Sequence, residues 1–216
     1  MDMSLFPYFL VSSILLTMTP GPDNLYLLAK SIADGARAGI ILAAGLASGI
    51  VFHTCLVILG VAALVKSSPI AFAALKYVGA AYLFYLAYGA FTAKIADAQP
   101  TEAAAGQATA AGSNGETSAF AIYRKGLIMN ILNPKVLLFF LAFLPQFVDP
   151  NNESPGLAIA MLGGIFSLQA LILFTLIALC AGKLRGFLNQ GAKSQRMLNR
   201  IQGVVLLGIG CLLLVF

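Results

Sequence analysis

Asp23 and Asn24 close the stretch MTPGPDN, residues 18–24, which interrupts a long apolar run. Three residues that disfavour a regular helix stand directly before them: Pro20, Gly21 and Pro22. Proline lacks an amide hydrogen and clashes with the preceding turn, while glycine adds backbone freedom. A carboxylate at such a break can bind either a proton or the ammonium group of a substrate, and the neighbouring amide can donate and accept hydrogen bonds. We therefore expect a binding or coupling site here, although Asp23 could instead act only as a helix cap.

A second interruption is predicted in GLIMNILNPKVLLFF, residues 126–140. Asn133 can cap a helix, and Pro134 suits the first position of a new one. Lys135 could bind a substrate carboxylate, pair with the acid of the first break, or extend toward the membrane surface. Asn130 adds an amide one turn earlier. The proline could also be only a kink, which membrane helices tolerate.

Two further polar side chains, His53 and Gln169, lie in runs that are otherwise apolar. Ionisable residues inside a membrane segment commonly mark a functional site. A neutral histidine bonded to a backbone carbonyl would explain His53 equally well, and Gln169 could serve only to join two helices.

The composition requires a membrane. Of 216 residues, 60% are hydrophobic and only 10% are charged, and a soluble domain cannot bury so much apolar side chain. A spanning helix needs roughly 20 apolar residues. Such runs occur at 5–29, 39–64, 70–91, 126–147, 156–181 and 198–216. We therefore expect an all-α integral membrane protein with six transmembrane helices, of which the first and fourth are broken, in contact with the lipid bilayer.

The distribution of basic residues predicts the orientation. Ten of the thirteen lysines and arginines follow the first, third and fifth expected helices. Basic loops stay cytoplasmic, so both termini are expected on the periplasmic or extracellular side. The net charge of +5 is then a topology signal, and it gives no reason to expect a nucleic-acid partner.

The middle of the chain divides it into two groups of three helices, residues 1–95 and 123–216. We expect residues 96–122 to be a flexible cytoplasmic linker, because 98–118 is low in complexity and rich in Ala, Gly and Thr.

The two groups resemble each other weakly. A shift of 124 residues places Gly39 on Gly163 and Gly79 on Gly203, and Pro20 then falls one residue from Pro145. Because three is an odd number, such repeats must be inverted in the membrane, as they are in many transporters. The half-helices after the two breaks would then point their N-terminal ends inward and form a cradle for a carboxylate.

Gly45 and Gly49 form a small-xxx-small pair that allows two helices to approach closely. This approach could occur within one protomer or between the protomers of a homodimer.

The stretch PGPDNLYLLAKSIADGARAGI resembles the signature of the lysine exporter (LysE/RhtB) family of amino-acid efflux proteins. Similar segments follow in order, among them GLASGIVFHTCLVILGVAAL, LKYVGAAYLFYLAYGAF and GLIMNILNPKVLLFFLAFLPQFV. The resemblance covers nearly the whole chain except 98–118. It implies a secondary transporter of the bacterial inner membrane that exports amino acids by proton antiport, with no enzymatic activity and no cofactor. The single acid at the break favours a neutral substrate, such as threonine, homoserine or an aliphatic amino acid.

Two alternatives from other classes remain. A membrane thiol-disulfide relay needs a reactive cysteine pair, whereas Cys55, Cys180 and Cys211 fall in three different helices, where we expect them to be buried. A divalent-metal exporter should have loops rich in His or acids, and this chain has a single His, so no metal site is expected.

Overall fold

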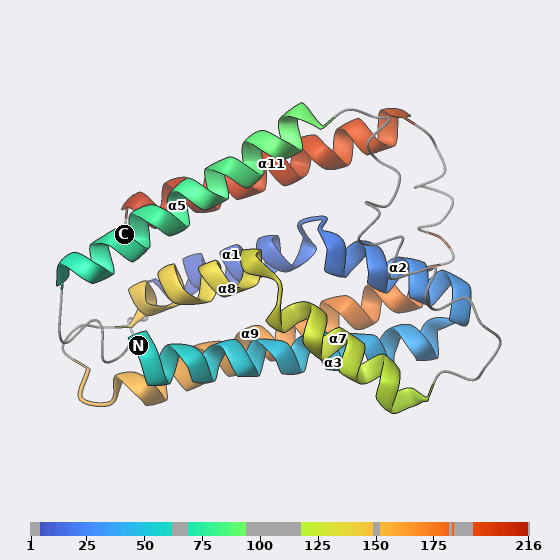
Figure 1. Cartoon of the computed structure of the whole chain (residues 1–216), viewed down its shortest axis with the longest axis horizontal. Helices are drawn as coiled ribbons and strands as arrows, with labels where there is room; N and C mark the ends of the chain where they lie inside the picture. Colours follow the sequence, from blue (N-terminus) through green and yellow to red (C-terminus); the bar gives the residue numbers. More distant parts are fainter. Residues whose placement is uncertain are drawn as a thin grey trace.

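The computed structural model describes residues 5–61, 69–93, 118–148, 152–181, 183 and 192–215, and every element within these ranges is a helix. Most of the expected linker, residues 96–117, lies outside the described residues. The structure therefore confirms the all-helical class (Figure 1).

The first expected break is confirmed. Helix α1 (Phe6–Met18) ends before Thr19, and α2 (Pro22–Asp34) begins three residues after Thr19. Gly35 then ends α2 with a φ of 86°, a conformation that favours glycine, and the chain turns directly into α3 (Ala36–Leu56). A π-helical turn, η1 (Val57–Val61), continues α3.

The second expected break is also present. Helix α7 (Ala119–Ile131) and helix α8 (Pro134–Ala142) are separated by Leu132 and Asn133, and the chain bends by 54° there. A 3-10 turn, η3 (Leu144–Phe147), follows. Residues 119–122 form the first turn of α7, although we expected them in the linker. Their sequence, Ala-Phe-Ala-Ile, is compatible with a helix, so the helix begins before the basic pair Arg124 and Lys125.

Helix α3 lies between α7 and α9 (Pro155–Leu179). Glycines make both approaches close: a Cβ on Gly45 would lie 2.1 Å from the carbonyl oxygen of Tyr123 on α7, and a Cβ on Gly163 would lie 2.1 Å from Oγ1 of Thr54. A Cβ on Gly49 would likewise meet Asn130 at 2.6 Å. The pair Gly45 and Gly49 thus packs within one chain, which was one of the two alternatives.

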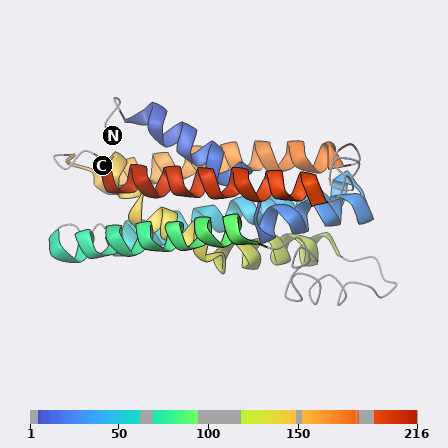
Figure 2. The ribbon, with the colours of Figure 1, turned by 90° about the horizontal axis from the view of Figure 1, so that it is seen from above.

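The remaining long helices, α5 (Pro69–Thr92) and α11 (Ala192–Val215), run side by side along one flank of the molecule (Figures 1 and 2). Glycines again allow the contact, since Gly203 faces the ring of Phe91 and Gly210 faces the ring of Phe84. The start of α1 and the end of α11 lie at the same end of the molecule (Figure 1).

Three helical segments are long and apolar enough to cross a membrane: Ala36–Gly60, Pro155–Leu179 and Arg196–Val215. The bent pair α7–α8 would be a fourth span, and α1 is a shorter apolar helix. The chain is therefore a multi-pass membrane protein. The arrangement of six spans in two repeats stays a prediction.

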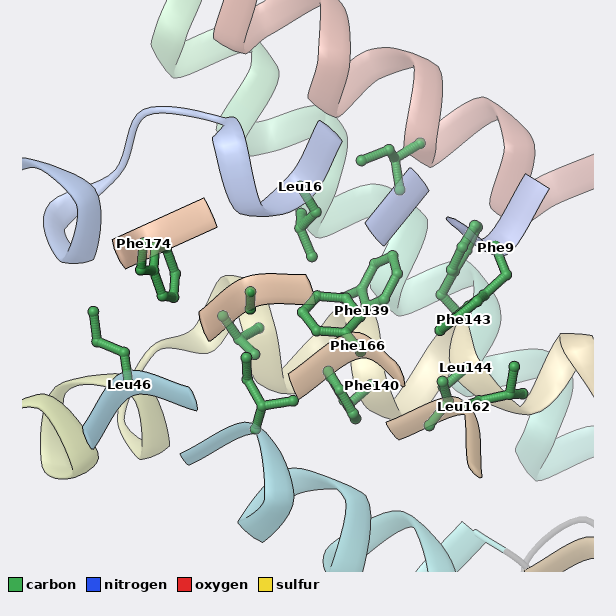
Figure 3. Packing of buried hydrophobic residues seen from close by; sticks show 14 of the residues in the cluster. Phe9, Leu16, Leu46, Phe139, Phe140, Phe143, Leu144, Leu162, Phe166 and Phe174 are labelled. Atoms are coloured by element: carbon green, nitrogen blue, oxygen red, sulfur yellow. The ribbon is translucent and has the colours of Figure 1, made fainter. Parts of the chain in front are cut away.

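A cluster of phenylalanines fills the space between α1, α8 and α9 (Figure 3). The centroids of Phe139 and Phe143 are 4.6 Å apart, and those of Phe140 and Phe166 are 5.1 Å apart. Phe9 joins the cluster from α1, with its ring centroid 6.5 Å from that of Phe166. These rings fix α8 and α9 around the first half of the first broken helix.

The three cysteines are exposed, so the expectation that they are buried is wrong. A small, weakly polar side chain can face hydrocarbon at little cost, and a lipid-facing position therefore suits cysteine as well as a core position does.

Candidate functional site

The two helix breaks meet at Asp23. Its Oδ2 accepts a hydrogen bond of 2.8 Å from Nδ2 of Asn133, and Nδ2 of Asn130 lies 3.5 Å away. All three side chains are buried. A carboxylate from the first break is therefore held by amides from the second.

The carbonyls at the end of α1 are bound by side chains because the helix cannot bind them. Pro20 has no amide hydrogen, so the carbonyl of Leu16 loses its partner one turn later. Asn24 folds back and donates from Nδ2 to the carbonyl oxygens of Thr17, at 2.8 Å, and Thr19, at 3.2 Å. The side chain of Asn24 therefore satisfies backbone carbonyls at the break, which explains why an asparagine follows the acid.

Lys135 reaches the same carbonyls from α8. Its Nζ lies 3.3 Å from the oxygen of Thr19 and 3.5 Å from that of Leu16. Among the described residues the ion pair seen is Lys30 with Asp34, so Lys135 does not pair directly with Asp23, as one alternative had it. Nor does it extend to the membrane surface. It joins α8 to the end of α1.

The second break is completed by His53. Pro134 cannot donate to the carbonyl of Asn130, which instead accepts from the backbone N–H of Asn133 at 3.0 Å. Nε2 of His53 lies 3.0 Å from the same oxygen. Because a carbonyl only accepts, Nε2 carries the hydrogen, and the buried Nδ1 has no partner among the described residues. Of the two readings of His53, the structure shows the histidine bonded to a backbone carbonyl.

Asn133 has two roles in this arrangement. Its Oδ1 accepts from the backbone N–H of Lys135 at 3.0 Å, which caps α8 as expected, while its Nδ2 binds Asp23. One side chain thus fixes both the start of α8 and the acid of the first break.

Gln169 joins helices. From α9 its Nε2 donates to Oγ1 of Thr17 at 2.9 Å and lies 3.4 Å from the carbonyl of Ser13, both on α1. It does not line the cavity described below, so the reading as a link between helices is the one that the structure shows.

A small cavity lies where the breaks meet. Its polar lining comes from Thr17, Asp23, Asn24, Asn130, Asn133 and Lys135. Its apolar lining comes from Leu16, Ile50, Val136, Phe166 and Phe174. The volume is about 20 Å³, enough for about one water molecule, which needs roughly 10–15 Å³ on this measure. The cavity is only partly enclosed, and the space inside it is much smaller than an amino acid.

The first turns of α2 and α8 both face this cavity, through Asp23 and Asn24 on one and Lys135 and Val136 on the other. A helix start carries partial positive charge and unpaired amide hydrogens, so the two starts together favour an anionic group beside them.

The apolar wall was missed from the sequence. Ile50 lies on α3, and Phe166 and Phe174 lie on α9. Both helices are apolar, so the sequence does not distinguish these three residues from other core or lipid-facing residues. Figure 3 shows Phe174 and Leu16 on one side of the aromatic cluster, next to this cavity. Only the fold distinguishes them from neighbouring side chains.

Comparison with known proteins places the chain in a family. The model of the LysE type translocator family matches residues 14–215, which is nearly the whole chain and includes both breaks. The chain belongs to the LysE family. An uncharacterized membrane protein of Pseudomonas aeruginosa is 32% identical over 202 residues, covering 94% of this chain and 91% of that protein.

Other relatives of this LysE-family chain have a substrate in their names. A leucine efflux protein of Klebsiella pneumoniae is 28% identical over 93% of this chain and 90% of its own length. A leucine efflux protein of Salmonella choleraesuis is 27% identical over 93% of this chain and 90% of its own length. No solved structure matches.

The features that would suit the alternative functions are not gathered at this site of the LysE-family chain. Within the part of the chain that the structure describes, no group of three His, Cys, Asp or Glu side chains could hold a metal ion. The exposed cysteines are absent from the cavity lining.

Proposed function

We propose that this protein exports a neutral, aliphatic amino acid from the cytoplasm by proton antiport, and that the cavity between the two breaks is its substrate site. The observation that carries the proposal is the meeting of both interrupted helices at one buried carboxylate, Asp23. Irregular backbone at membrane depth persists where protein or a wet cavity satisfies it, and transporters place their substrate at such points.

An inverted repeat of three helices supports transport by alternating access. Contacts between α3 and α9 are reciprocal under the shift of 124 residues: Gly39 meets Ala178, and Gly163 meets Thr54. Under this shift, Gly39 corresponds to Gly163 and Thr54 corresponds to Ala178. The contact of Gly39 with Ala178 therefore corresponds to the contact of Gly163 with Thr54. Helices related by a two-fold axis make contacts of this kind. We infer six spans in two such repeats, in a bacterial inner membrane.

The two kinds of lining suggest the substrate class. An amino acid carries an ammonium and a carboxylate on one carbon, and the polar residues at the breaks offer groups of both signs. The apolar wall of Ile50, Phe166 and Phe174 suits an uncharged aliphatic side chain. The leucine efflux relatives agree with this inference. Leucine is therefore the first substrate to test.

Asp23 is the group that we assign to proton coupling. A carboxylate can bind a proton or the substrate ammonium, but a single bound proton removes the charge that attracts the ammonium. Competition of this kind makes exchange obligatory without a second ion site. The neutral amides around Asp23 support the assignment, because they can hold the group in either state.

The test is transport by Asp23→Asn in proteoliposomes. The variant keeps the size of the side chain and removes the titration, so leucine accumulation driven by an imposed pH gradient should be lost, while leucine exchange across equal pH persists at a reduced rate. Asp34→Asn, which removes an acid of the Lys30 pair at the end of α2, is the matched control and should keep driven accumulation. Accumulation by Asp23→Asn that still follows the pH gradient would overturn the coupling role.

A further inference from the structure

Among the described residues the ammonium of Lys135 makes no direct ion pair with a carboxylate, although it lies in a largely buried part of the protein. Its hydrogen-bond partners are two neutral carbonyls, those of Thr19 and Leu16, at 3.3 Å and 3.5 Å. A typical N–H···O bond measures about 2.9–3.0 Å, and a lysine ammonium has three hydrogens to donate. The group is therefore held by long contacts with neutral acceptors.

Such a group binds a carboxylate in preference. Bonds between an ammonium and a carboxylate are shorter and roughly twice as strong as bonds to neutral acceptors. Asp23 is the nearby acid, but its Oδ2 is directed to the amides of Asn130 and Asn133. A carboxylate that entered the cavity from outside the chain would meet the Lys135 ammonium as its strongest donor.

The same cavity holds acceptors for the opposite end of an amino acid. Besides Asp23, the Oδ1 atom of Asn130 is buried and has no hydrogen-bond partner among the described residues. An ammonium can donate to both. Donor and acceptors line one space, as the adjacent charges of an α-amino acid require.

The volume of the cavity connects binding with motion. At about 20 Å³ it admits no amino acid until an element that lines it moves. Lys135 ties α8 to the end of α1, which is one of those elements. If the Lys135 side chain leaves these carbonyls to bind a substrate carboxylate, the end of α1 loses its link to α8.

We propose that the Lys135 ammonium is shared between two alternative partners: the carbonyls at the end of α1 in the closed, substrate-free state, and the carboxylate of the amino acid in the loaded state. Lys135 is then a residue that selects for the α-carboxylate and also links substrate binding to the release of α1. This inference rests on the proposed function of the cavity. A purely structural lysine would only stabilise the negative end of the α1 dipole.

Binding of leucine and of leucinamide to the purified protein separates these roles. Leucinamide keeps the ammonium and the side chain and lacks the carboxylate, and stabilisation against heat at several ligand concentrations gives both affinities. The wild type should prefer leucine by about tenfold or more, as expected for one charge-assisted contact. Lys135→Met should bring the ratio of the two affinities close to one, and Lys135→Arg should restore part of it.

Lys30→Met is the matched control, because it removes a lysine that is bonded to Asp34 outside the cavity, and its ratio should equal that of the wild type. Equal weakening of both ligands by Lys135→Met would overturn the proposal and leave a structural lysine. A wild type that binds neither leucine nor any other neutral amino acid would overturn the proposed function together with this inference.

Gly21→Ala tests the competition without removing the charge. A Cβ at Gly21 would lie 3.2 Å from Nζ of Lys135, so the ammonium must shift slightly, and its contacts with the α1 carbonyls, which are already long, should weaken. The extended backbone of Gly21 accepts alanine, since its φ is −164°. Leucine should bind this variant more tightly than the wild type, because α1 competes less for the ammonium. An unchanged or weaker affinity would contradict the sharing of Lys135.

Discussion

Asp23 is held by amide side chains, and this choice of partner matters if the group changes its charge, as the proposed coupling requires. A buried acid paired with a cation is costly to neutralise, since the remaining cation is left alone in a poorly polar surrounding. Amides from Asn130 and Asn133 leave no charge behind when the acid binds a proton. The arrangement therefore suits a carboxylate that alternates between a proton and an ammonium.

Substitution of Asn133 by aspartate should make the protein sensitive to pH. The new side chain can still accept from the backbone N–H of Lys135, but it replaces the donor that lies 2.8 Å from Asp23 by a second carboxylate. Two carboxylates so close cannot both ionise without strong repulsion. The melting temperature of Asn133→Asp should therefore fall, relative to the wild type, as the pH rises from about 5 to about 8.

Asn133→Ser is the control for this change. It keeps an oxygen for the cap and introduces no charge, so its melting temperature should follow the pH dependence of the wild type. Parallel curves for the aspartate variant and the wild type would show that residue 133 and Asp23 do not interact.

The apolar wall should set the size of the substrate. Phe174 lines the cavity, and replacement by leucine removes part of the ring volume without introducing polarity. We expect Phe174→Leu to raise the rate of phenylalanine exchange relative to leucine exchange in proteoliposomes. Phe84→Leu changes a ring that packs against Gly210 between α5 and α11, and it should leave this ratio unchanged. Identical ratios in Phe174→Leu and the wild type would remove Phe174 from the specificity wall.

The broken helices illustrate what can be predicted from a sequence and what cannot. Pro20, Pro22 and Pro134 predicted both breaks, because the loss of an amide hydrogen is a local property. The side chains that bind the carbonyls at these breaks are distant in the sequence or on another helix: Lys135 reaches that of Leu16, and His53 reaches that of Asn130. No local pattern could have assigned them, and each had competing explanations until the fold joined them to the breaks.

The internal repeat was only partly informative. The shift of 124 residues relates α3 to α9, but Pro134 follows Pro22 by 112 residues, so the same shift does not align the two breaks. The match of Pro20 with Pro145 therefore paired a break with the 3-10 turn η3. Connections between helices differ in length between the two groups, and a single offset cannot describe both.

His53 should stabilise the second break. His53→Ala removes the donor at 3.0 Å from the carbonyl of Asn130, which keeps the backbone N–H of Asn133, so the free energy of unfolding should fall by about 0.5–1.5 kcal/mol. His53→Gln keeps an N–H donor and should recover part of the loss. The melting temperature of the purified variants measures this difference. A full loss of stability in the glutamine variant, equal to that of alanine, would contradict the hydrogen-bond explanation.

Adjacent glycines on α9 provide a matched test of the contact between α3 and α9. A Cβ on Gly163 would lie within 2.8 Å of three atoms of Thr54, including its Cβ, so a rotation of the threonine cannot relieve the clash. A Cβ on Gly164 would meet nothing within 4 Å. Gly163→Ala should lower the yield of monodisperse protein in size-exclusion chromatography, whereas Gly164→Ala should leave it unchanged.

The same comparison is open to refutation. Equal yields of the two alanine variants would mean that α3 and α9 are not in the close contact that the structure shows.

The orientation of the whole molecule is predicted from its charges. The start of α1 and the end of α11 lie at one end of the molecule, and the basic residues around Arg37 and Arg124 lie on helices that begin at the opposite end (Figure 1). We expect that opposite end to be cytoplasmic. In a variant without native cysteines, a cysteine at position 155 should react from outside with a membrane-impermeant maleimide, and a cysteine at position 112 should react only after the cells are opened. The reverse pattern would invert the topology.

The phenylalanine cluster also bears on how a cell keeps its energy. Phe9 and Phe143 lie on the side of the cluster away from Phe174 (Figure 3). The ring centroid of Phe147 is 5.4 Å from that of Phe9 and 4.8 Å from that of Phe143. A chain of water molecules needs polar partners along its path, and aromatic rings supply few. With the proposed orientation, protons outside the cell would find no wet route to Asp23 through these rings. Under the proposed proton coupling, an idle copy of the protein could remain in the membrane at high copy number without discharging the gradient.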